Sequence, residues 1–230
     1  MNDAPYNAPI RFSKVAGNVS YILRNGGGAL LQIAFIWTAL RVLGLVALGI
    51  DEESFVVALV SVVQFIALPV FWLAILNCCI AAYLGEEQTL TDYVTSSIQV
   101  YRQSVLLILP GLIIGLMLAG FVLPTFYVLA VVVLLLAILV AERPPLSLWP
   151  IRLGALLQGQ IAAFLIGAFL FGMVALLFLL GTQDAITETG KIETLNQAIS
   201  QTVRNIFLHV VTLLVGAAVY AELRNIEAGV

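Results

Sequence analysis

Long apolar runs alternate with short polar breaks along most of this chain. The runs lie at about 29–50, 55–84, 105–123, 126–141, 161–180 and 198–220. Apolar runs of about 20 residues are long enough to cross a bilayer core of about 30 Å as helices. The pattern predicts an all-α polytopic membrane protein with six transmembrane helices.

Three stretches that precede the first, third and fifth runs have an amphipathic pattern instead. They lie at about 12–23, 89–103 and 146–157. In the first stretch, Phe12, Val15, Val19 and Ile22 recur at spacings of three and four, with polar residues between them. Such spacing places apolar side chains on one face of a helix and favours a position in the membrane interface. We expect three interfacial amphipathic helices on the cytoplasmic side.

The three amphipathic stretches share an internal spacing. In each one, an apolar residue and a hydroxyl residue precede a polar pair by the same twelve positions. The matching pairs are Phe12-Ser13 with Arg24-Asn25, Leu90-Thr91 with Arg102-Gln103, and Leu146-Ser147 with Gln158-Gly159. This pattern suggests a threefold internal repeat of an in-plane helix followed by a two-span hairpin. Because chance could also produce three such matches in so apolar a sequence, the repeat is a hypothesis.

Composition sets the domain organisation. The chain is 62% hydrophobic and 10% charged, whereas about 25% of residues are charged in soluble domains. We therefore expect a single helical membrane domain at 10–221, with no separate soluble domain. Residues 1–9 are predicted to be a flexible N-terminus, and residues 222–230 a short cytoplasmic tail.

The positions of the basic residues predict the orientation. Cytoplasmic loops of membrane proteins carry an excess of Lys and Arg. With the N-terminus inside, the outer loops hold only Lys191, and the inner segments hold Arg11, Lys14, Arg24, Arg102, Arg143, Arg152 and Arg224. This bias predicts a multi-pass protein of the cell inner membrane with both termini in the cytoplasm. Basic residues near the surface would contact anionic lipid, and the candidates are Arg11, Lys14, Arg24, Arg102 and Arg152.

Two short motifs resemble a known family. They are the Glu-Arg-Pro-Pro-Leu run at 142–146 and the Tyr-Ala-Glu-Leu-Arg run at 220–224. With the order of segments, they are similar to the membrane domain of some bacterial glycerophosphoryl diester phosphodiesterases, which has stand-alone relatives of unknown function. The chain departs from that pattern at Leu153-Gly154 and at 157–159. No counterpart of the phosphodiesterase domain is present, so the resemblance implies a membrane fold and no catalytic residues.

Residues able to support catalysis are sparse. The chain has a single histidine, His209, and two adjacent cysteines, Cys78 and Cys79, which we interpret as packing residues. It contains neither an H-E-x-x-H metal motif nor a G-x-S-x-G nucleophile motif. No Asp or Glu lies deep in a predicted span. We therefore predict no catalytic residue, no cofactor and no metal ligand, and we do not expect an enzyme.

Polar side chains in the predicted spans are the exception. Those of the sixth span fall on one side of a helix, about 140° wide at 100° per residue, and Arg41 lies in the first span. Polar groups are costly in hydrocarbon and should face water or the protein interior. One interpretation is a hydrated helix end; the other is a polar vestibule that accepts an anion such as a lipid phosphate. The vestibule candidates are Arg41, Gln197, Gln201, Arg204, Asn205 and His209.

Three functional hypotheses follow from these patterns. The first is a non-enzymatic protein that interacts with membrane lipids, mainly anionic ones, or organises the membrane through a membrane-protein partner. The second is a transporter or channel for a small solute or lipid, with a polar path along the sixth span. The third is an accessory subunit of a larger membrane complex. Nothing in the sequence predicts nucleic-acid binding.

Overall fold

The computed structural model describes residues 9–48, 55–117, 122–180 and 195–229. Every regular element in these ranges is a helix, and none of them is a strand. Our predictions for residues 1–8, for the acidic residues at 51–53 and for the loop at 181–194 lie outside the described residues. The elements are α1 (Phe12–Leu48), α2 (Phe55–Leu84), α3 (Leu90–Met117), α4 (Val122–Glu142), η2 (Leu146–Leu148), α5 (Trp149–Leu157), α6 (Ile161–Leu180) and α7 (Leu195–Ala228).

Several helices are long and apolar enough to cross a membrane. Four such stretches lie in the described residues, at Phe12–Gly44, Val62–Leu84, Pro124–Glu142 and Ile199–Ala228. The bent pair α5 and α6 counts as a fifth if it forms one broken span. The prediction of an all-helical fold with several helices long and apolar enough to cross a membrane is therefore confirmed. The number of six spans and the threefold repeat stay predictions.

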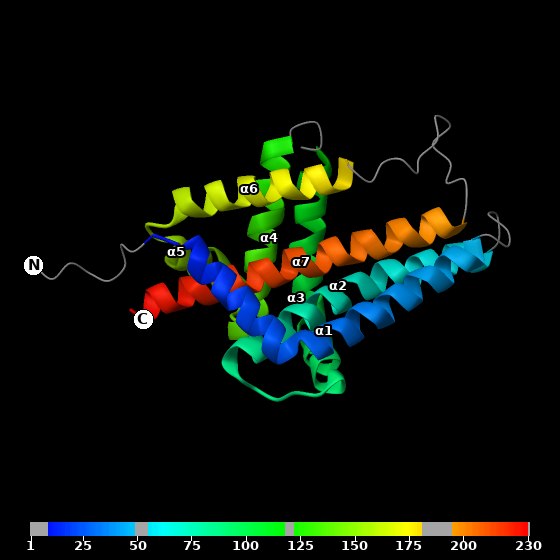
Figure 1. Ribbon diagram of the computed structural model, residues 1–230, viewed down its shortest axis with the longest axis horizontal. Coiled ribbons are helices and arrows are strands. Elements are labelled where there is room, and N and C mark those ends of the chain that lie inside the picture. Colours follow the sequence, from blue (N-terminus) through cyan, green and yellow to red (C-terminus); the bar gives the residue numbers. More distant parts are fainter. Residues whose placement is uncertain (1–8, 49–54, 118–121, 181–194, 230) are drawn as a thin grey trace, which may run out of the picture.

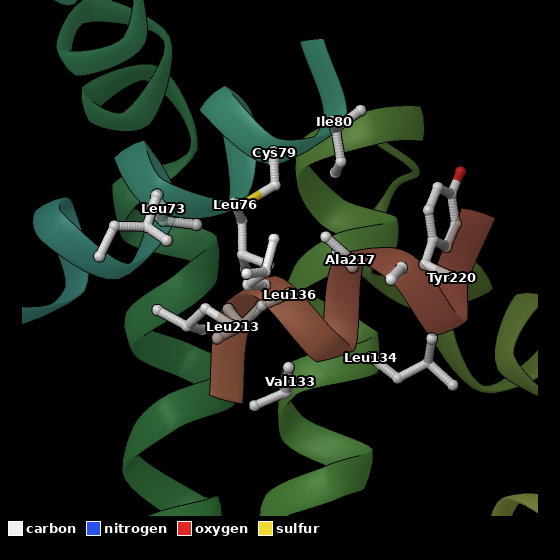
Figure 2. Close-up of a cluster of buried hydrophobic side chains, with 14 of the residues drawn as sticks. Leu73, Leu76, Cys79, Ile80, Val133, Leu134, Leu136, Leu213, Ala217 and Tyr220 are labelled. Atoms are coloured by element: carbon white, nitrogen blue, oxygen red, sulfur yellow. The ribbon is translucent and has the colours of Figure 1, made fainter. Parts of the chain in front are cut away.

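The helices pack around a centre formed by α2, α4 and α7. Helix α1 runs against α2 and α7, while the antiparallel pair α3 and α4 crosses them, and α6 packs on α4 (Figure 1). Figure 2 shows the centre, where Leu76 of α2, Leu136 of α4 and Leu213 of α7 meet and are at most 1% exposed. On α7, Leu213, Ala217 and Tyr220 follow the spacing of one helix face, which explains why this side points inward.

Two glycines allow neighbouring helices to approach α4 closely. A Cβ atom added to Gly216 of α7 would lie 2.2 Å from Cγ1 of Val133, and one added to Gly111 of α3 would lie 2.5 Å from Cγ2 of Val132. Membrane helices use small residues in this way because lipid supplies no strong force that presses helices together. Gly111 therefore serves packing inside the bundle.

The first amphipathic stretch does not form a separate helix. Helix α1 continues through the glycines at 26–28, where a break was predicted. A glycine inside a helix costs about 1 kcal/mol relative to alanine, less than the several kcal/mol for an unsatisfied backbone group in a membrane. Gly26 is buried, and a Cβ atom there would lie 2.7 Å from Cβ of Ala82 on α2. The helix bends along its length instead (Figure 1).

The second amphipathic stretch is also continuous with the helix that follows it. Helix α3 passes through Arg102 without a break. At its start, the Asp92 carboxylate accepts the Thr89 backbone N–H at 2.8 Å, and the Asp92 N–H donates to the Thr89 hydroxyl at 3.3 Å. This reciprocal cap satisfies donors that a helix start leaves free. The hydrogen bonds from the Thr89 hydroxyl and N–H lower the pKa of Asp92.

Only the third amphipathic stretch ends in a real break. Helices α5 and α6 meet at an angle of 93°, and Gly159 between them has a φ of +76°. Glycine adopts this left-handed conformation without steric cost. Two further boundaries differ from prediction. Pro124 lies in the first turn of α4 rather than in a turn before it, and most of the predicted tail at 222–230 continues α7.

Candidate functional site

Helix ends that are far apart in sequence meet at one end of the molecule. Asn225 of α7 donates to the Tyr83 hydroxyl of α2 at 2.7 Å. The backbone N–H of Ile10, just before α1, donates to the buried side chain of Gln160, just before α6, at 2.8 Å. The C-terminus and the start of α1 lie on this side in Figure 1. These are the ends that the sequence predicts to be cytoplasmic.

Charged side chains bind α4, α5 and α7 together at this end. Arg152 of α5 donates to both carboxylate oxygens of Glu142 on α4 and to both of Glu227 on α7, at distances of 2.5–2.9 Å. The Tyr220 hydroxyl also donates to Glu142 at 2.8 Å. Arg224 completes the set by pairing with Glu227. We call these five side chains the charged junction.

The charged junction corrects one predicted lipid contact. Arg152 was expected to contact lipid phosphate, but its guanidinium is engaged by two carboxylates and its side chain is only 19% exposed. Bidentate pairs of this kind are the strongest that arginine makes. Arg152 therefore holds α5 against the ends of α4 and α7 and is not available to lipid.

The other predicted lipid contacts are exposed. None of them forms an ion pair within the described part of the chain. Exposed apolar side chains lie beside them in sequence, including Phe12 at 52%, Leu23 at 47% and Ile98 at 60% exposure. Positive charges among exposed apolar groups are typical of helices that contact a membrane interface. We call this set the basic surface, and its members are Arg11, Lys14, Arg24 and Arg102.

His209 lies between two tryptophan side chains. Its ring centroid is 5.8 Å from that of Trp37 on α1 and 5.4 Å from that of Trp72 on α2. Phe71 also contacts Trp37, at 4.9 Å. Among the described residues, neither His209 Nδ1 nor Trp72 Nε1 has a hydrogen-bond partner, although both atoms are buried. We call His209, Trp37 and Trp72 the aromatic–histidine cluster.

Arg41 lies further along the contact between α1 and α2. Its guanidinium donates to the side-chain oxygen of Gln64 at 3.1 Å, and Gln64 donates in turn to the Leu40 carbonyl at 3.2 Å. No ion pair joins Arg41 to a carboxylate in the described ranges. Gln64 also lines a shallow groove between the two helices with Leu43, Val63 and other apolar residues.

The predicted vestibule residues differ in their exposure and contacts, and the vestibule itself stays a prediction. On α7, Asn205 is exposed and Gln201 is half-buried, whereas His209 lies in the aromatic–histidine cluster. Arg204 is half-buried with a shielded Nε, and no hydrogen bond or ion pair among the described residues joins it to Arg41 or His209. The side chain of Gln197 lies outside the described residues. The sequence thus identified the polar side chains in the spans. It did not show which neighbours each of them contacts.

The partners of these side chains were not predicted from the sequence. Glu142 and Glu227 were treated as a break and a tail, although opposite charges at helix ends on the same predicted side were a usable signal. Gln64 and the two tryptophans gave no such signal, because a lone amide or indole in an apolar run is ordinary. In the described part of the chain, no group of three His, Cys, Asp or Glu side chains could hold a metal ion.

Comparison with known proteins adds no relative. No family model and no curated protein matches the chain, and no solved structure matches its fold. The resemblance to the membrane domain of bacterial glycerophosphoryl diester phosphodiesterases therefore stays a prediction. The function has to be argued from the geometry alone.

Proposed function

We propose that this protein is a non-enzymatic integral membrane protein that binds anionic lipid through its basic surface. The observation that carries the proposal is the contrast in charge pairing. Glu142 and Glu227 are paired with arginines in the charged junction, whereas the basic surface has no carboxylate partner in the described ranges. Unpaired exposed cations beside exposed apolar groups fit a layer of anionic headgroups.

The arrangement of α1 supports this function. Val15 and Ile22 are buried against the rest of the protein, while Lys14 and Arg24 are exposed. The first part of the helix is anchored to α7, since Asn18 donates to the Ala218 carbonyl at 3.3 Å. Lipid binding would therefore act on a helix that is already held in place. The proposed role is to organise lipid around the bundle rather than to insert the chain.

The same proposal includes an orientation. The basic surface would face the cytoplasmic leaflet of the inner membrane, with both termini on that side, because positive charges concentrate in cytoplasmic segments. The helix ends joined by the charged junction would then lie at this face. The same surface could also bind a membrane-protein partner, but lipid is the simpler ligand.

The test is replacement of Arg11, Lys14 and Arg24 by Gln. Each basic residue near an anionic surface contributes about 1 kcal/mol, so hydrogen-exchange protection of residues 11–24 should fall in vesicles of phosphatidylglycerol. Protection in phosphatidylcholine should stay unchanged. The control is Arg41→Gln, which removes one exposed positive charge and none from the basic surface. Equal protection of the triple variant and the unmodified protein in phosphatidylglycerol would refute the proposal.

One observation favours transport as a second candidate. The aromatic–histidine cluster contains buried polar atoms that have no hydrogen-bond partner among the described residues, and such atoms can serve a polar ligand that crosses the bundle. In that case, His209→Phe should reduce solute flux into proteoliposomes while the basic-surface variant keeps it. Absence of flux for every solute class tested would leave lipid binding as the proposal.

A further inference from the structure

A small polar pocket lies where α2, α3 and α4 meet. Its lining contributes an amide, two hydroxyls and a guanidinium, together with two valines. Every one of these polar groups can donate a hydrogen bond. The lining residues are Asn77, Ser96, Ser97, Val100, Val140 and Arg143. A pocket rich in donors and lacking a carboxylate in its lining is suited to an oxyanion.

Two donors in this pocket are not fully used. The side-chain nitrogen of Asn77 is buried and has no hydrogen-bond partner among the described residues. The Arg143 guanidinium contacts only neutral groups there, donating to Gln99 at 3.0 Å and to the Ser96 hydroxyl at 3.4 Å. The second of these bonds is long and weak. An anion could therefore accept hydrogen bonds from both side chains. In exchange, Arg143 would give up only its weak bond to Ser96.

The backbone of Arg143 supplies an independent observation. Arg143 has a φ of +47° and is the only residue other than glycine with a positive φ in the described part of the chain. It follows directly after α4, where glycine is the usual residue because L side chains are strained in this conformation. A strained residue that carries the single positive charge of a donor-rich pocket points to a functional constraint.

We propose that this pocket binds a phosphate group, with Arg143 supplying the charge and Asn77 and Ser96 supplying donors. In this structure the side chains close the pocket, so the exposed Arg143 side chain would have to swing away from Ser96 for the phosphate to reach Asn77. Arginine matches phosphate geometry with paired donors. The phosphate could belong to a lipid headgroup or be free in solution. Only the lipid version rests on the proposed function.

The experiment measures binding to the purified full-length protein in mild detergent. The probes are dioctanoyl phosphatidylglycerol, dioctanoylglycerol, which has the same chains without phosphate, and inorganic phosphate. Arg143→Gly should weaken phosphatidylglycerol binding about tenfold or more, because a charge-assisted pair is lost. The same variant should raise the unfolding temperature, because glycine relieves the strain. Arg41→Gln is the control, since it removes an exposed positive charge that belongs neither to this pocket nor to the basic surface.

A second variant protects the test against a folding defect. Asn77→Leu keeps Arg143 and removes the unpartnered donor, so it should weaken binding while the protein unfolds at the same temperature or higher. If inorganic phosphate binds with the same dependence on both variants, the site takes free phosphate; if only the lipid does, it takes a headgroup. Equal binding of dioctanoylglycerol, or equal binding by Arg143→Gly and Arg41→Gln, would overturn the site. Lipid preference lost only in the basic-surface variant would leave the proposed function standing without this pocket.

Discussion

Helix α7 carries two polar groups that differ in how they are satisfied. Near its end, Tyr220 and Glu227 belong to the charged junction, where each charge faces an opposite charge. Further from that end, His209 lies between Trp37 and Trp72. There, His209 Nδ1 and Trp72 Nε1 have no partner among the described residues. One helix thus takes part in a completed network and in an incomplete one.

The difference follows from what lies next to each part of the helix. At the end of α7, side chains from α4 and α5 are long enough to converge on the same few atoms. Inside the bundle, the neighbours of His209 are aromatic rings, which exclude water and offer an indole donor but no strong acceptor. An unsatisfied buried polar group costs about 1–3 kcal/mol. The charged junction therefore stabilises the fold, whereas the buried nitrogens of the aromatic–histidine cluster could still bind a polar ligand.

The largest expected effect comes from removing the centre of the charged junction. Arg152→Gln removes the cation that holds both Glu142 and Glu227 closely and leaves only Arg224 to offset their charges. Breaking a buried ion pair costs about 3–5 kcal/mol, and we expect about 2–3 kcal/mol here because these carboxylates are partly exposed. Thermal unfolding in mild detergent measures the change. Arg102→Gln, which removes an exposed arginine, should stay within about 0.5 kcal/mol of the unmodified protein.

A neutral version of the junction separates charge from packing. Replacing Glu142, Arg152 and Glu227 together by Gln removes the unpaired carboxylates along with the cation. Because neutral replacements of buried ion pairs are often tolerated, this triple variant should be more stable than Arg152→Gln alone. If it is equally unstable, the loss comes from packing of the arginine side chain and not from its charge.

Much of the helical framework could be predicted from the sequence, because apolar length alone identifies helices in a membrane. The breaks between helices were harder to predict from the sequence. The three amphipathic stretches looked alike, yet only the one that ends at Gly159 forms a separate helix. The glycines at 26–28 stay helical, and one of them packs closely on Ala82. The same residue type breaks one helix and lets another pack, and tertiary contacts decide which.

The candidate sites could also be predicted only in part, because tertiary contacts decide which side chains meet. Arg41 and His209 could be noticed in the sequence, since a polar side chain in an apolar run is visible there. Their partners were not visible, because Gln64 and the tryptophans come from helices far away along the chain. The pocket at Arg143 was missed as well. Its signal is a left-handed backbone at an arginine, and only the structure contains that information.

A smaller effect should distinguish the two polar groups of α7 directly. Tyr220→Phe removes one hydroxyl from the charged junction and should cost about 1 kcal/mol, because Glu142 loses a hydrogen bond. His209→Phe keeps an aromatic ring between the tryptophans and removes a nitrogen without a partner. It should therefore leave the unfolding temperature unchanged or raise it. Thermal unfolding of both variants, side by side, gives the comparison.

The aromatic–histidine cluster has its own control. His209→Ala removes the ring and leaves a void, so it should destabilise the protein by about 2 kcal/mol or more. Tryptophan fluorescence should change in this variant and in His209→Phe, but not in Tyr220→Phe. If His209→Phe is as unstable as His209→Ala, the imidazole makes a polar contact that the cluster needs, and the contrast with the charged junction disappears.

The smallest effect concerns a carboxylate that is held without any cation. Asp92 caps α3 through Thr89 alone, and these hydrogen bonds lower its pKa. Its contribution to stability is therefore complete well above the ordinary aspartate pKa of about 4. It is lost as the pH falls through the lowered value, because the protonated carboxyl is a weaker acceptor. The unfolding temperature of Asp92→Asn should lie slightly below that of the unmodified protein at pH 6, and the difference should shrink towards pH 3. In a Thr89→Ala background, the Asp92→Asn substitution should have little effect at either pH. A difference that stays constant with pH would mean that the cap acts through shape rather than charge, unlike the arginine pairs of the charged junction.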